Sequence, residues 1–185
     1  MLPGEESSPD RRRDQRTASS PGRRTPGRRT PGRPDRYGQA LLAAQGVAMA
    51  GLAWPGHPRW ALPRPVAALA ALVGLAGATV AEEGVRFLGR DLTPFVEPGE
   101  DARLYTTGPF SASRHPVYAG GLLLGAALAV LRRRPEPLAA FALLAGVLHL
   151  KANVEERHLR ERFGVAYVEY AAATPRLFGV PRTNL

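Results

Sequence analysis

The residues PVAALAALVGLAGATVA at positions 65–81 contain no charged side chain. Three other stretches also lack Asp, Glu, Lys and Arg, namely residues 37–58, 115–131 and 137–150. A membrane-spanning helix needs about 20 apolar residues, and about 17 is the usual lower limit. The first three stretches along the chain reach this limit. The fourth reaches it if its helix continues past Lys151, whose ammonium would extend to the membrane interface.

The sequence therefore predicts an all-α integral membrane protein with about four transmembrane helices and a C-terminal amphipathic helical segment. The alternative is a soluble all-α bundle with alanine-rich core helices. The chain has 185 residues, which leaves no room for a second large domain. It has no cysteine, which excludes disulfides, a thiolate nucleophile and cysteine-based metal sites. We expect no metal ion.

Residues 1–36 form a separate Arg/Pro/Gly-rich tail with ten arginines, five acidic residues and no aromatic residue. Such a segment cannot build a hydrophobic core, so we expect it to be disordered and the membrane domain to cover residues 37–185. Either the tail binds nucleic acid or anionic lipid through its arginines, or it is a solvated extension or a misassigned start. We favour the second alternative and expect no nucleic-acid partner.

The arginines also indicate an orientation. The tail, the 82–114 connection and the C-terminal segment carry most of them, and with four spans all three lie on one side, which the positive-inside rule makes cytoplasmic. Only one of the 25 basic residues is a lysine, and Ala, Gly and Pro are abundant, which is typical of a bacterial high-GC genome. Together with the predicted spans, this composition leads us to expect a protein of the bacterial inner membrane. Arg132–Arg134 fall on the opposite side, so the alternative is that residues 115–150 form a hairpin that does not cross fully.

A first group of candidate functional residues begins at Arg114. Pro116 suits the first position of a helix, and it keeps the preceding His115 extended. Arg114 and His115 therefore lie at a helix N-terminus, where free N–H groups favour an anionic ligand. Tyr118 lies in the first turn, and Gly120 leaves room for close packing. The alternative is that these side chains anchor an ordinary spanning helix at the interface.

A second group lies at 153–158. On a helix, His149, Asn153 and Glu156 fall on one face, while Glu155 points about 100° away. One carboxylate can then hold a ligand cation while the other pairs with an arginine such as Arg114. The alternative is a solvated helix end. Downstream, Phe163-Gly164 predicts a helix stop, followed by a short helix carrying two tyrosines, which either cover a pocket or pack at the interface.

Three segments carry a family resemblance: DLTPF at 91–95, TTGPFSASRHPVYAGG at 106–121 and EERHLRERFGVAYVEY…PR at 155–176. They resemble the isoprenylcysteine carboxyl methyltransferase family and its phospholipid methyltransferase relatives, over roughly residues 37–180. The resemblance implies a membrane enzyme that uses S-adenosylmethionine at a cytosolic site. It implies methyl transfer to a lipophilic small-molecule or lipid acceptor with a carboxylate, thiol or amine.

The resemblance also assigns residues. Arg114 and Glu155 are the predicted catalytic residues, and the predicted cofactor-binding residues are His115, Tyr118, Gly120 and Glu156. The chain has Ser111-Ala112 where family members often carry other residues, which affects the substrate more than the cofactor. The alternatives are an NADPH-dependent membrane reductase of the sterol-reductase-like type, or a non-catalytic membrane protein. The oligomeric state is not predicted.

Overall fold

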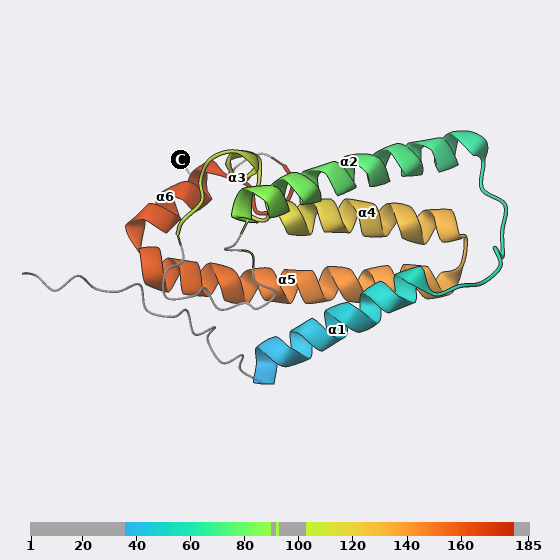
Figure 1. Ribbon diagram of the computed structural model, residues 1–185, viewed down its shortest axis with the longest axis horizontal. Helices are drawn as coiled ribbons and strands as arrows, with labels where there is room; N and C mark the ends of the chain where they lie inside the picture. Colours follow the sequence, from blue (N-terminus) through green and yellow to red (C-terminus); the bar gives the residue numbers. More distant parts are fainter. Residues whose placement is uncertain (1–35, 90–91, 93–102, 180–185) are drawn as a thin grey trace, which may run out of the picture. The chain divides into compact units, whose positions relative to one another are not determined.

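The computed structural model describes residues 36–89, 92 and 103–179 (Figure 1). The chain divides into a unit over Met1–Pro31 and a unit over Gly32–Leu185, and the described residues belong to the second. The Arg-rich tail before residue 36 and most of the DLTPF motif lie outside the described residues. What the sequence predicts for them stays a prediction.

Every regular element in the described part of the chain is a helix, and no strand occurs there, which confirms the all-α class. The helices are α1 (Arg36–Ala53), α2 (Arg64–Leu88), α3 (Pro109–Ala112), α4 (Pro116–Arg132), α5 (Pro135–Phe163) and α6 (Val165–Ala173). The predicted boundaries at Pro116 and Phe163 are confirmed. Gly164 separates α5 from α6 with a φ of +54°, a left-handed conformation that glycine adopts without strain.

Two of the described helices, α2 and α5, are long and apolar enough to cross a membrane. Their 25 and 29 residues correspond to about 38 and 44 Å, more than the hydrocarbon thickness of about 30 Å. In the most apolar 18-residue stretch of each helix, only 17% (α2) and 33% (α5) is buried inside the protein. A core helix of a soluble protein would be mostly buried. α4 is a shorter apolar helix and α1 does not qualify, so the four predicted spans are not confirmed.

The outward face of α2 carries large aliphatic side chains. Leu69, Leu72 and Leu75 are 62%, 64% and 67% exposed. Water in contact with so many apolar side chains would cost free energy, whereas hydrocarbon would not. This face favours the membrane protein over the soluble bundle.

The inward face of α2 packs against α4, which in turn packs against α5, with α1 on the far side of α5 (Figure 1). Gly77 of α2 and Gly120 of α4 make the first contact close. A Cβ on Gly77 would lie 2.7 Å from the Gly120 carbonyl oxygen, and a Cβ on Gly120 would clash with the Gly77 carbonyl in return. Small residues thus let the two backbones meet, as is common between membrane helices. Gly121 is different, because nothing lies within 4 Å of its Cβ position.

We expect Gly120→Ala or Gly77→Ala to destabilise the protein by about 1–3 kcal/mol, because the helices must separate to admit the methyl group. Gly121→Ala is the matched control, since its methyl group meets open space and alanine favours a helix. Thermal unfolding in detergent measures the difference. Equal melting temperatures for Gly120→Ala and Gly121→Ala would contradict the close contact.

The arginine triplet has a structural explanation. Arg132 Nη2 donates to the Ala53 carbonyl at 3.2 Å, and Arg134 Nη1 donates to the Trp54 carbonyl at 3.3 Å. Arg133 between them adopts a left-handed conformation with φ +56° and ends α4. Arg132 and Arg134 therefore bind the carbonyl groups at the end of α1 and just after it, and Arg133 forms the turn between α4 and α5. The C-terminus of a helix favours such cations.

The prediction that the Lys151 ammonium extends to the membrane interface is wrong. The helix does continue past this residue, since α5 is unbroken to Phe163. Its side chain, however, does not extend to the interface. Lys151 is only 3% exposed, and its Nζ donates to Gln45 Oε1 of α1 at 2.8 Å. The reason is that α1 supplies a hydrogen-bond acceptor inside the bundle, which the sequence pattern of α5 alone does not reveal.

Candidate functional site

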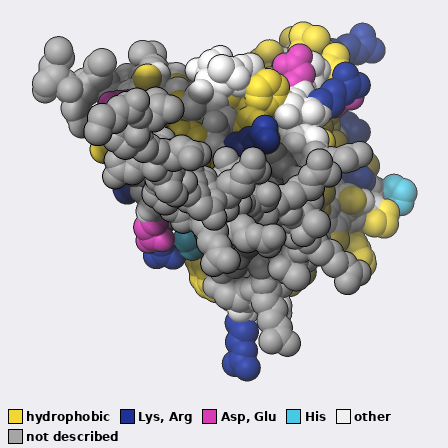
Figure 2. Space-filling view, turned by 60° about the vertical axis from the view of Figure 1, so that its left-hand side comes forward, with side chains coloured by type: hydrophobic (Ala, Val, Ile, Leu, Met, Phe, Trp, Pro, Cys, Tyr) yellow, Lys and Arg dark blue, Asp and Glu magenta, His cyan; other side chains and the backbone are white. Residues whose placement is uncertain are grey.

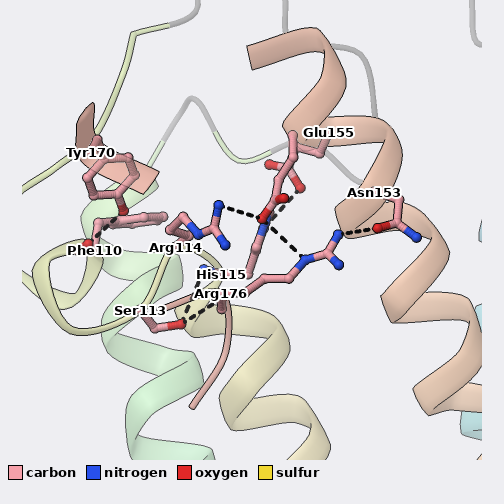
Figure 3. A network of polar contacts seen from close by, with 9 residues as sticks. Phe110, Ser113, Arg114, His115, Asn153, Glu155, Tyr170 and Arg176 are labelled. Carbon is pink, nitrogen blue, oxygen red and sulfur yellow. Dashed lines mark hydrogen bonds and ion pairs between the residues drawn. The ribbon is translucent and has the colours of Figure 1, made fainter. Parts of the chain in front are cut away.

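The start of α4 is held by the segment that follows α6. The Arg114 N–H donates to the Pro175 carbonyl at 2.9 Å, and the His115 N–H donates to the Arg176 carbonyl at 3.2 Å. α6 is itself fixed to α3, because the Tyr170 hydroxyl donates to a backbone carbonyl there at 2.6 Å (Figure 3). Residues more than 60 positions apart in the sequence thus form one end of the bundle.

Glu156 is the centre of a buried ionic cluster at this end. Its partners Arg114, His115 and Arg176 are labelled in Figure 3. Its Oε1 lies 3.3 Å from Arg114 Nη1, 3.2 Å from His115 Nε2 and 3.2 Å from Arg176 Nε. Arg176 also donates from Nη2 to Asn153 Oδ1 at 2.6 Å. The glutamate side chain is 13% exposed, so one carboxylate balances two guanidinium groups and an imidazole in a largely dry environment.

Glu155 reaches the other side of the same imidazole. Its Oε2 lies 3.4 Å from His115 Nδ1, while Glu156 lies at Nε2. Burial by itself lowers the pKa of His115, but the hydrogen bonds and negative charges of the two glutamates outweigh burial and raise it. A protonated His115 can donate from both nitrogens, so it fixes the direction of both carboxylates. Glu155 is more open than Glu156, with 34% of its side chain exposed.

Tyr118 completes this group. Its ring stacks on the His115 ring, with 5.3 Å between centroids and 3° between planes. Gly120, the remaining predicted cofactor-binding residue, lies where α2 packs on α4, and its Cβ position is occupied by α2. The structure thus brings together five of the six predicted site residues and gives Gly120 a packing role. Cofactor binding by any of the six stays a prediction.

Three buried polar atoms of the cluster lack a hydrogen-bond partner among the described residues: Arg114 Nε, Arg176 Nε and the Tyr167 hydroxyl. Arg176 Nε faces the Glu156 carboxylate at 3.2 Å as an ion pair, which leaves Arg114 Nε and the Tyr167 hydroxyl. Tyr167 is fully buried, and burial raises its pKa to about 12, although the charge of nearby Arg114 acts in the opposite direction. The raised pKa keeps the proton on the Tyr167 hydroxyl, so this hydroxyl and the Arg114 Nε–H group are both hydrogen-bond donors. A buried donor without an acceptor costs free energy, so both are suited to an acceptor on a ligand.

The sequence reasoning did not identify Arg176 or Ser113 as site residues. Ser113 Oγ accepts from the His115 N–H at 3.2 Å and donates to the Arg176 carbonyl at 3.3 Å, so it joins the two segments. The sequence indicated a role for these two residues only in that Ser113 lies in the motif at 106–121 and Arg176 in the motif at 155–176. Asn153 and Glu156 share a face as predicted and both bind Arg176, whereas His149 is exposed.

The apolar outer surface of α2 and the buried charged cluster together define a small helical membrane protein with a polar site at one end of its bundle. Residues 66–166 match the sequence model of the phospholipid methyltransferase family, and the chain belongs to this family. The predicted resemblance is thereby confirmed.

Two curated relatives extend this result. The chain is 33% identical over 99 residues to protein-S-isoprenylcysteine O-methyltransferase B of Arabidopsis thaliana, covering 52% of this chain and 49% of the relative. It is 29% identical over 130 residues to the nickel-cobalt-cadmium resistance protein NccN of Alcaligenes xylosoxydans xylosoxydans, covering 70% of this chain and 58% of the relative. The chain thus spans about half the length of the curated relatives it matches.

Proposed function

We propose that this protein is an S-adenosylmethionine-dependent methyltransferase that methylates a lipophilic small molecule or lipid at the cytosolic face of the membrane. The observation that carries the proposal is the convergence of Arg114 and His115, at the start of α4, with Glu155 and Glu156 of α5. Membership of the phospholipid methyltransferase family supports the reaction type.

The residues present fit the charged groups of this cofactor. The Glu156 carboxylate is surrounded by Arg114, His115 and Arg176. Glu155 contacts His115 and is also affected by Tyr118 and Lys151, but a third of its side chain stays exposed. Glu155 is therefore the better partner for the cofactor ammonium, and Glu156 is the residue that organises the cluster. The unpartnered donors of Arg114 and Tyr167 suit the cofactor carboxylate.

When bound, S-adenosylmethionine supplies an electrophilic methyl group on a sulfonium. Tyr118 offers an aromatic face that attracts a cation. The two glutamates raise the pKa of His115 and so favour its protonated form, which disfavours contact with the sulfonium. We therefore assign His115 the role of orienting Glu155 and Glu156. An ionised acceptor needs no general base, so these residues act by positioning the reactants and excluding water.

The membrane arrangement is part of the proposal. Alongside α2 and α5 we include α1 and α4 as spans, because their 18 and 17 residues lie close to the lower limit for crossing. Among the described side chains that Figure 2 shows, hydrophobic, basic and acidic ones lie next to one another. Such a mixed surface suits the membrane–water boundary of a bacterial inner membrane, where a lipophilic acceptor meets a charged cofactor.

Calorimetry on the detergent-purified protein tests the proposal with S-adenosylmethionine, S-adenosylhomocysteine and NADPH. We expect the first two to bind, NADPH not to bind, and His115→Ala to weaken the binding, because both glutamates lose their common partner. Binding of NADPH alone would instead identify a reductase. No binding of any of the three would indicate a non-catalytic membrane protein.

A further inference from the structure

α1 lies outside the residues 66–166 that match the family, yet its residues Ala48 and Leu52 belong to the hydrophobic cluster against which Tyr118 packs. A polar side chain of α1 also points to the candidate site. Gln45 accepts a hydrogen bond from Lys151 Nζ at 2.8 Å. Lys151 is only 3% exposed, so its ammonium lies inside the bundle. A lysine within an apolar helix is energetically expensive and is therefore a functional candidate.

Lys151 connects Gln45 with the cluster in two ways. Its Nζ lies 5.8 Å from the centre of the Tyr118 ring, a cation–π contact. Tyr118 is the residue whose ring stacks on His115. Lys151 also precedes Glu155 by four residues on α5, so the two side chains share one face of the helix and attract each other.

We propose that Gln45 and Lys151 are positioning residues of the site. Gln45 fixes the ammonium of Lys151 against the Tyr118 ring, and this contact keeps Tyr118 stacked on His115. The stack in turn fixes the imidazole between Glu155 and Glu156. The expected effect on cofactor affinity rests on the proposed function, whereas the effect on the stack does not.

The physical reason is the flexibility of lysine. Its four-carbon chain and compact ammonium have no preferred direction unless acceptors provide one. In a low-dielectric interior, a hydrogen bond between a charged donor and an amide oxygen is strong, and its loss makes the ammonium turn to other acceptors. Removing Gln45 therefore lets the ammonium turn toward Glu155, which attracts it, and changes its contact with the Tyr118 ring although α4 itself is unchanged.

Nuclear magnetic resonance of the histidine side chains tests the stack without any ligand. The stacked Tyr118 ring shifts the His115 ring signals, and a Tyr118→Leu variant gives the unstacked reference. We expect Gln45→Leu and Lys151→Met to move these signals toward that reference. Gln45→Glu keeps an acceptor and should retain the wild-type signals. Gly46→Ala, on the same helix with nothing within 4 Å of its Cβ position, should also retain them.

Wild-type His115 signals in both Gln45→Leu and Lys151→Met would overturn the proposal. A lower melting temperature with unchanged signals would overturn it as well, because that combination means that the pair only joins α1 to α5.

Cofactor affinity provides the second measurement. Gln45→Leu and Lys151→Met should each weaken S-adenosylmethionine binding about tenfold. The double variant should lose no more than Lys151→Met alone, because both changes break one chain of contacts. Additive losses would overturn the proposal. If the wild-type protein does not bind S-adenosylmethionine, the proposed function fails, and the histidine signals still decide whether the pair positions Tyr118.

Discussion

Glu156→Ala is expected to destabilise the protein by about 3–5 kcal/mol, because removal of one partner leaves buried charges uncompensated. Arg114, His115 and Arg176 all lie within 3.3 Å of the Glu156 carboxylate, and its side chain is 13% exposed. These three residues belong to the start of α4 and to the segment after α6. The alanine variant therefore loosens the attachment of both segments to α5.

This expectation differs from the one that the sequence suggests. From the sequence, a glutamate near the end of an apolar helix is expected to be a solvated charge. Its removal would then weaken ligand binding and leave the stability of the fold nearly unchanged. Unfolding in detergent distinguishes the two, and Glu161→Ala is the matched control because Glu161 is an exposed carboxylate on the same helix. A Glu156→Ala protein as stable as Glu161→Ala would show that the cluster does not hold the structure together.

Glu155→Gln is expected to weaken S-adenosylmethionine binding about 100-fold, since a desolvated charge pair with the cofactor ammonium is lost. The fold should be retained, because the side chain is 34% exposed and the amide can still accept a hydrogen bond from His115. Calorimetry gives the affinity and thermal unfolding gives the stability of the same preparation.

Two other glutamates of α5, Glu161 and Glu156, provide the controls for the Glu155→Gln result. Glu161→Gln should leave the affinity unchanged. If Glu155→Gln binds the cofactor normally while a folded Glu156→Gln does not, the two glutamates have exchanged the roles proposed here.

Much of the helical architecture could be predicted from local signals. Pro116 and Phe163-Gly164 fixed two helix boundaries, because proline and glycine act on their immediate neighbours. The environment of Lys151 could not be predicted in this way, since Gln45 lies 106 residues earlier. The number of spans could not be predicted from apolar length alone, because the 18 residues of α1 and the 17 of α4 lie close to the lower limit for crossing a membrane.

The same distinction applies to the candidate site. Arg114, His115 and Glu156 belong to motifs that carry the family resemblance, and the structure places them together. Gly120 belongs to the same motif, but nothing local indicates that α2 occupies the space next to it. Arg176 was not identified, because its part in the cluster depends on the chain turning back after α6 to meet Arg114 and His115.

That return of the chain has a consequence for the order in which the protein is made. Arg176 follows every described helix, and its carbonyl and guanidinium groups contact His115 and Glu156. A nascent chain that has emerged from the ribosome only as far as α6 contains all the described helices but lacks Arg176, which contacts Glu156. The ionic cluster can therefore close only after α1 to α6 have been synthesised.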